Sequence, residues 1–133
     1  MIWYIENSTR YVREEKALAA LAARAAWLGP LKWRIDDVLR LVWEADILVG
    51  ARTYPITLQY PHHFPNVPPS ILPRGAPERW SGHQYGMGGE LCLEWGPDNW
   101  HPEILGADMV QSAYRLLSAE HPTDAASAVV PTR

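Results

Sequence analysis

Cysteine, membrane-length apolar runs and blocks of like charge are the features that this sequence has least of. The single cysteine, Cys92, excludes an intramolecular disulfide. No apolar stretch approaches the roughly 20 residues of a membrane helix, and the N-terminus has no basic start, apolar run and small-residue cleavage site in sequence. We therefore expect a protein of a reduced, cytoplasmic compartment with no membrane partner.

The chain also lacks the charge and ligand patterns of several binding classes. Its net charge of -3 and pI near 5.9 argue against a nucleic-acid partner, because phosphate binding requires a concentrated basic face. The histidines show no paired ligand spacing, and the adjacent His62 and His63 would point to opposite faces of a strand. We expect neither nucleic acid nor metal to bind.

The composition fits one globular domain. With 133 residues, 47% of them hydrophobic, the chain can bury roughly two-thirds of its unfolded surface. We expect a single domain over residues 1–133, with residues 1–8 as an N-terminal extension and residues 125–133 as a flexible tail.

Apolar residues at helical spacing predict two helices. The first covers residues 11–28 and is stopped by Gly29-Pro30. The second begins at Pro102, where a helix accepts proline, and Glu103 suits the dipole of its first turn. An irregular, glycine-rich segment over residues 82–99 precedes it.

Alternating apolar residues predict antiparallel strands between these helices. Residues 33–49 and 54–60 alternate, which indicates three strands with a turn around Gly50. The following segment, residues 61–77, contains too many prolines for a helix or a central strand, but residues 70–72 suit a short edge strand. The order of elements predicts an α+β fold.

The surroundings of Cys92 favour a reactive thiol. It lies in the string Gly-Glu-Leu-Cys-Leu-Glu, residues 89–94. An unperturbed thiol is only about 3% thiolate at neutral pH, so exposure and nearby positive charge or amides decide its reactivity. Gly88 and Gly89 permit close backbone approach, which leaves room for the C-terminal tail of a partner. The alternative is a buried, inert cysteine.

Several motifs between residues 11 and 124 resemble those of ubiquitin-conjugating enzymes. The matching residues are Tyr60-Pro61, the double-proline segment Phe64-Pro65-Asn66-Val67-Pro68-Pro69, the cysteine string 89–94, and Trp100, Pro102 and Asp124 at the family's spacing. The resemblance implies a UBC-like α+β fold with an N-terminal helix, a four-stranded antiparallel meander, a cysteine-bearing loop and a second helix. The two C-terminal helices of eukaryotic members are missing.

The resemblance also implies a reaction. Cys92 would accept a ubiquitin-like modifier from an activating enzyme as a thioester and pass it to an amine of a protein target, without a cofactor. The compact form resembles bacterial members that occur with such partners in defence against phage. Two alternatives are a non-catalytic binding module of the same fold and a hydrolase that pairs Cys92 with His83 or His101.

The oxyanion donor departs from the family pattern. The family's histidine-proline-asparagine triplet is represented by His83, Gln84 and Tyr85, so the expected asparagine is absent. Gln84 offers the same amide donor, His83 is its rival, and Asn99 or backbone amides are further alternatives. Hydrogen bonding that only shapes the loop is the plainer role for His83 and Gln84.

The remaining candidate site residues would orient the attacking amine or bind partner proteins. By the resemblance Asp124 orients the attacking amine, and Glu94 is near enough in sequence to share this role, although loop acids are often simply solvated. Basic residues near the first helix resemble those that family members offer to the activating enzyme, or form an ordinary solvated face: Arg10, Arg13, Lys16 and Arg24. The residues that we expect to contact substrate or partner are Gly88, Gly89, Glu94, Asn99, Trp100, Arg13 and Lys16.

Overall fold

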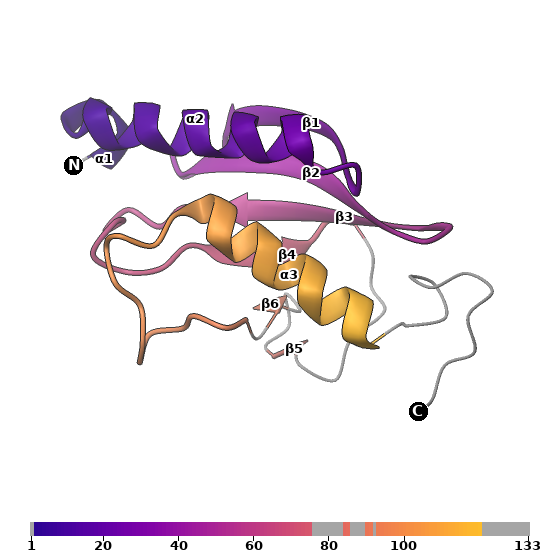
Figure 1. Cartoon of the computed structure of the whole chain (residues 1–133). Helices are drawn as coiled ribbons and strands as arrows, with labels where there is room; N and C mark the ends of the chain where they lie inside the picture. Colours follow the sequence, from indigo (N-terminus) through magenta and orange to yellow (C-terminus); the bar gives the residue numbers. More distant parts are fainter. Residues whose placement is uncertain (1, 76–83, 86–89, 92, 121–133) are drawn as a thin grey trace.

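The structure, a computed structural model, describes residues 2–75, 84–85, 90–91 and 93–120. Its elements, in chain order, are α1 (Trp3–Glu6), α2 (Ser8–Arg24), β1 (Leu28–Ile35), β2 (Leu41–Val49), β3 (Arg52–Gln59), β4 (Ser70–Pro73), β5 (Gln84–Tyr85), β6 (Glu90–Leu91) and α3 (Gly106–Glu120). Figure 1 shows α2 along β1 and β2, and α3 on the side of β3 and β4. Within the described part, no helix is long and apolar enough to cross a membrane.

The main sheet is the expected four-stranded antiparallel meander. Its strand order is β1-β2-β3-β4. The predicted turn around Gly50 joins β2 to β3, and the φ angle of Gly50 is 63°, a conformation that glycine adopts at little cost. The predicted edge strand is β4. A separate two-stranded ladder pairs β5 with β6, so the segment over residues 82–99, which we expected to be irregular, contains a short paired region.

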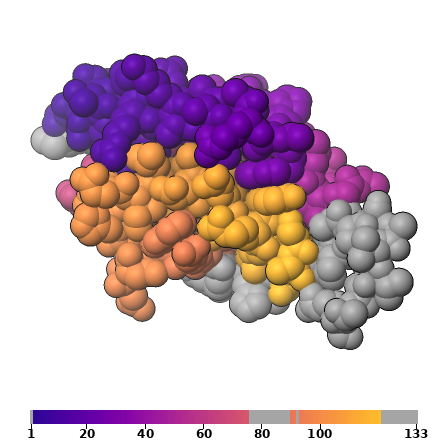
Figure 2. All heavy atoms as spheres, in the orientation of Figure 1, coloured from indigo at the N-terminus to yellow at the C-terminus, as the bar shows by residue number. Residues whose placement is uncertain are grey.

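Both long helices contribute to one hydrophobic core. Leu18 and Leu21 of α2 and Val110 and Leu117 of α3 are buried with the inward side chains of the sheet, such as Trp43. On β2 the buried and half-buried residues alternate after Trp43, as expected for a strand with one face on the core. Figure 2 shows α2 and α3 in contact on one side of the molecule.

The first helix is shorter than its sequence pattern predicts. It ends at Arg24 instead of Leu28, because Leu28 is already part of β1 and lies opposite Ile47 of β2. Gly29 and Pro30 therefore lie within β1. Proline is tolerated there because β1 is an edge strand, which needs fewer N–H donors than a central strand does.

The last helix begins later than predicted, at Gly106 instead of Pro102. Pro102 and Glu103 lie in a turn, and the backbone N–H of Leu105 donates to the carboxylate of Asp108 at 2.8 Å. A side chain near the start of a helix commonly satisfies such a free N–H, so Asp108 helps to fix the beginning of α3.

Trp3, within the predicted N-terminal extension, belongs to the core. Its side chain, on α1, is only 5% exposed. The centre of its ring lies 5.4 Å from that of Tyr60 and 4.6 Å from that of Phe64. Burial of a tryptophan is among the larger single contributions to a small core, so the segment before α2 helps to hold the double-proline region.

Candidate active site

The chain enters the cysteine motif from an anchored strand. In β6, Glu90 pairs with Tyr85 and Leu91 with Gln84 of β5, and β6 also lies beside β4. Leu91 is buried in the core. The strand thus holds the backbone up to the residue before Cys92.

Several predicted site residues lie outside the described residues. These are Cys92, His83, Gly88, Gly89 and Asp124, and the side chain of Gln84 is also outside the description. Their assigned roles therefore stay predictions. Glu90 and Leu91 before Cys92, and the chain from Leu93 to Glu120, are described.

A groove of about 540 Å³ runs beside the cysteine motif. Leu91 and Leu93, the sequence neighbours of Cys92, both line it. Its other lining residues come from the proline segment, the chain around Trp95 and α3: Pro61, Val67, Pro68, Pro69, Ser70, Ile71, Glu90, Trp95, Gly96, Pro97 and Met109. The lining is mainly apolar, which suits an extended chain or an aliphatic side chain.

The chain after Cys92 is fastened to α3 through Glu94. The backbone N–H of Glu94 donates to the hydroxyl of Ser112 at 3.0 Å, and its carboxylate pairs with Arg115 at 3.0 Å. Both charged side chains are more than half exposed, so the ion pair contributes little to stability. It does place a guanidinium beside the residue that lies two positions after Cys92.

Asn99 holds a turn in the same loop. Its Oδ1 accepts the N–H of Gly96 at 2.7 Å, and its Nδ2 donates to the carbonyl of Glu94 at 2.8 Å. Both ends of the amide are thus used within the loop. The geometry supports a role for Asn99 in shaping the chain after Cys92.

Trp100 joins this loop to the double-proline segment. Its indole Nε1 donates to the carbonyl of Pro65 at 2.8 Å, and its ring lies 6.1 Å from that of Phe64. The indole of Trp100 thus connects the loop with the double-proline segment through one hydrogen bond and one ring contact.

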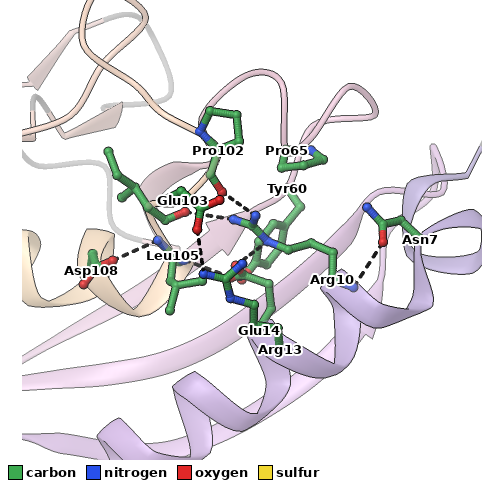
Figure 3. Close-up of polar contacts among 12 residues, drawn as sticks. Asn7, Arg10, Arg13, Glu14, Tyr60, Pro65, Pro102, Glu103, Leu105 and Asp108 are labelled. Carbon is green, nitrogen blue, oxygen red and sulfur yellow. Dashed lines mark hydrogen bonds and ion pairs between the residues drawn. The ribbon is translucent and has the colours of Figure 1, made fainter.

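A buried charged cluster, which the sequence reading missed, fixes the loop before α3. Arg10 and Glu14 of α2 form an ion pair with 3.0 Å between Nε and Oε2. The guanidinium of Arg10 also donates to the carbonyl of Pro102 (Figure 3). The same guanidinium donates to the carbonyl of Ile104 at 2.8 Å. Its Cζ lies 4.8 Å from the ring centre of Phe64. Arg10 therefore links α2, the double-proline segment and the loop.

Glu14 satisfies the remaining polar groups of this cluster. Its Oε1 accepts the hydroxyl of Tyr60 at 2.7 Å and the N–H of Gly106 at 2.8 Å, and its side chain is fully buried. Burial raises the pKa of Tyr60 well above its ordinary range, and the Glu14 carboxylate raises it further. The Tyr60 hydroxyl consequently keeps its proton and remains a donor. We call Arg10, Glu14 and Tyr60 the buried cluster.

The basic residues near the first helix divide into two groups. Arg10 is 7% exposed and occupied within the buried cluster, so it does not belong to a solvated basic face. Arg13 is about half exposed and pairs with Glu103 at 3.2 Å, while Lys16 and Arg24 are exposed. The sequence signal for the buried cluster was the i, i+4 spacing of its arginine and glutamate. Such pairs usually lie on the solvated surface of a helix, so the spacing alone did not indicate burial.

No group of three or more His, Cys, Asp or Glu side chains in the described ranges could hold a metal ion. His62 instead contacts the backbone, with 3.0 Å between its Nε2 and the carbonyl oxygen of Val38. The described side chains thus offer ion pairs, hydrogen bonds and an apolar groove.

No protein-family model and no curated protein sequence matches the chain. Solved structures do resemble it. S. cerevisiae Ubc12 is 16% identical with a TM-score of 0.64, over 90% of this chain and 71% of the yeast chain. A Plasmodium vivax ubiquitin conjugating enzyme E2 is 22% identical with a TM-score of 0.60, over 80% of this chain and 99% of the other.

Human ubiquitin-conjugating enzyme E2 G1 is 18% identical with a TM-score of 0.55, over 80% of this chain and 93% of the human chain. At these identities the likeness concerns the fold. The chain therefore has the fold of ubiquitin-conjugating enzymes, as its motifs predicted.

Proposed function

We propose that this protein is a ubiquitin-conjugating-like enzyme. It accepts a ubiquitin-like protein from an activating enzyme as a thioester on Cys92 and transfers it to an amine of a target protein. The observation that carries the proposal is the coincidence of a conjugating-enzyme fold with the sole cysteine, placed between two residues that line an apolar groove.

The thioester suits this role chemically. The Cys92 thiolate attacks the carbonyl carbon of the activating enzyme's thioester, and the thiolate of that enzyme leaves. A target amine then attacks the new thioester, loses a proton, and releases the Cys92 thiolate. A preorganised donor near the developing oxyanion is typically worth about 10² to 10³ in rate, and we assign it to the region of His83 and Gln84.

The described loop contributes a fixed frame for this chemistry. Ser112, Arg115 and Asn99 hold the chain at Glu94, and the buried cluster holds the carbonyls of Pro102 and Ile104. A site whose supporting residues are already ordered loses less entropy when the modifier binds, which favours a fixed orientation of the thioester for attack.

The test is a loading assay with the cognate activating enzyme, ATP and modifier. We expect an adduct that reductant removes from the wild type and that Cys92→Ala abolishes. Cys92→Ser should convert it into an ester that resists reductant. The absence of any adduct, together with full affinity for the modifier, would identify a non-catalytic binding module instead.

The pathway is proposed from the resemblance to compact bacterial members of the family. We place the protein in the cytoplasm of a bacterium, in a conjugation system that acts against phage. Genes for an activating enzyme and a ubiquitin-like protein should neighbour its own gene. A neighbourhood without either would contradict this assignment.

A further inference from the structure

Side-chain amines are scarce in this chain. Among its 12 basic residues only Lys16 and Lys32 are lysines, and the other 10 are arginines. A lysine amine can attack a thioester, whereas the delocalised guanidinium of arginine stays protonated and does not. For an enzyme that carries an activated acyl group, the choice between these two cations decides whether it modifies itself.

Both lysines lie away from the cysteine motif. Lys32 is exposed on β1, the strand at the far edge of the sheet from β4, and β4 is the strand beside β6. Three strand spacings separate β1 from β4, or about 14 Å. Lys16 is exposed on α2, and Figure 1 shows α2 and β1 on the opposite side of the molecule from β5 and β6.

Among the described residues, Arg115 is a cation that lies beside the cysteine loop. Its Nη2 is 3.0 Å from Oε1 of Glu94, and 58% of its side chain is exposed. Glu94 follows Cys92 by two residues, which limits the distance between their Cα atoms to about 7 Å. A lysine at position 115 would keep the charge beside Glu94 but would place an amine beside a residue only two positions from the acyl-bearing Cys92.

We propose that Arg115 is a specificity-determining residue: it supplies positive charge beside the cysteine loop without supplying a nucleophile, so the acyl group is kept for the target. The inference rests on the proposed function for its biological meaning. Its chemistry requires only that Cys92 can carry an acyl group.

A small acyl donor tests the inference without any protein partner. The probe is acetyl-diglycine activated as the thioester of 2-mercaptoethanesulfonate. Exchange forms a C–S bond to Cys92 and releases 2-mercaptoethanesulfonate. In Arg115→Lys the free amine of the new lysine then attacks the carbonyl, the amide forms, the C–S bond breaks, and the ammonium proton passes to solvent.

The matched control is Arg34→Lys. Arg34 also pairs with a glutamate, Glu44, at 2.8 Å and is also about half exposed, but it lies on β1. Cys92→Ala combined with Arg115→Lys measures direct reaction of the lysine with the probe. Mass spectrometry after hydroxylamine treatment, which cleaves thioesters, counts the amides at each lysine.

We expect amide at residue 115 of Arg115→Lys to exceed amide at residue 34 of Arg34→Lys by at least about tenfold, because proximity raises the effective concentration of the amine. The rate should rise about tenfold per pH unit below pH 10, as the free amine becomes more abundant. The wild type should carry only the hydroxylamine-sensitive adduct.

Equal amide yields in the two variants, or an unchanged yield at residue 115 after Cys92→Ala, would overturn the inference. Its failure can be told apart from failure of the proposed function. A normal Cys92 adduct without amide at residue 115 contradicts the role of Arg115 alone, whereas a Cys92 that forms no adduct with the probe contradicts both.

Discussion

At the scale of single residues, Glu14 of the buried cluster has hydrogen-bond donors for both of its carboxylate oxygens. Glu14 accepts from Arg10, Tyr60 and the N–H of Gly106. A buried ion pair is weak evidence for stability, since desolvation offsets much of its attraction, but removal of one partner leaves a costly buried charge. The cluster is thus better understood as a device that fixes one arrangement of α2 and the loop.

Gly106 packs against the buried cluster so closely that there is no room for a side chain. A Cβ added there would lie 2.7 Å from Oε1 of Glu14 and closer still to the hydroxyl oxygen of Tyr60. Alanine favours a helix over glycine by about 1 kcal/mol, yet overpacking of a rigid site typically costs about 1–3 kcal/mol. We expect Gly106→Ala to lower the free energy of unfolding, measured by urea denaturation.

The double-mutant cycle with Tyr60→Phe identifies the cause. Without the hydroxyl oxygen, the added methyl group has more room, so Gly106→Ala should cost less in Tyr60→Phe than in the wild type. Identical costs in both backgrounds would mean that contact with Tyr60 is not the source of the destabilisation.

At the scale of elements, the turn between β1 and β2 is organised by one carboxylate. Oδ1 of Asp36 accepts the N–H groups of Val38 and Arg40, and Oδ2 accepts the Arg40 guanidinium at 2.9 Å. Leu39 in the same turn has a φ angle of 65°. The turn therefore depends on Asp36 to hold a backbone conformation that leucine rarely adopts.

This arrangement predicts a dependence of stability on pH. Burial raises the pKa of Asp36, but the hydrogen bonds from Arg40 and Val38 outweigh it and hold the pKa below its ordinary value. A lowered pKa in the folded state adds stability that is present above about pH 4 and is lost as the pH falls further. Urea denaturation between pH 6 and pH 3 should show this loss.

Asp36→Asn is the matched variant for that prediction. It removes the titrating group, so its urea midpoint should fall less steeply with acid than that of the wild type. If the two proteins lose stability in parallel, other carboxylates govern the acid transition.

The ends of the two long helices could not be predicted from local sequence patterns. The pattern correctly predicted the four strands of the main sheet, the turn at Gly50 and both long helices, because alternation and helical periodicity are local signals, but it did not predict the short β5–β6 ladder. The helix ends differ because distant partners decide them. Leu28 pairs with Ile47, and Arg10 and Glu14 bind the chain at Pro102 and Gly106.

At the scale of the whole molecule, three distant segments meet around one aromatic group. Trp3, Phe64 and Trp100 come from α1, the proline segment and the loop, and Phe64 lies within 4.6 Å and 6.1 Å of the other two ring centres. The motif around Cys92 could be predicted from sequence because its residues are contiguous. The attachment of the buried cluster to the loop could not, since its contacts with Pro102, Ile104 and Gly106 span more than 90 positions.

At this scale, Arg10 attaches α2 to the loop before α3. Arg10→Lys keeps a positive charge beside Glu14, but a single ammonium cannot reproduce the forked contacts to the carbonyls of Pro102 and Ile104. Hydrogen bonds to a charged group contribute about 1.5–3 kcal/mol, so local opening should rise by roughly tenfold or more. Hydrogen exchange should therefore accelerate in residues 101–106.

Arg13→Lys provides the comparison on the same helix. Arg13 reaches the same loop, but through an exposed pair with Glu103 at 3.2 Å, and exposed pairs contribute at most about 1 kcal/mol. Exchange in residues 101–106 should therefore change little in this variant. Equal acceleration of exchange in both variants, or acceleration throughout the chain in Arg10→Lys, would show that Arg10 does not hold the loop in particular. Other contacts would then have to order the chain after Cys92.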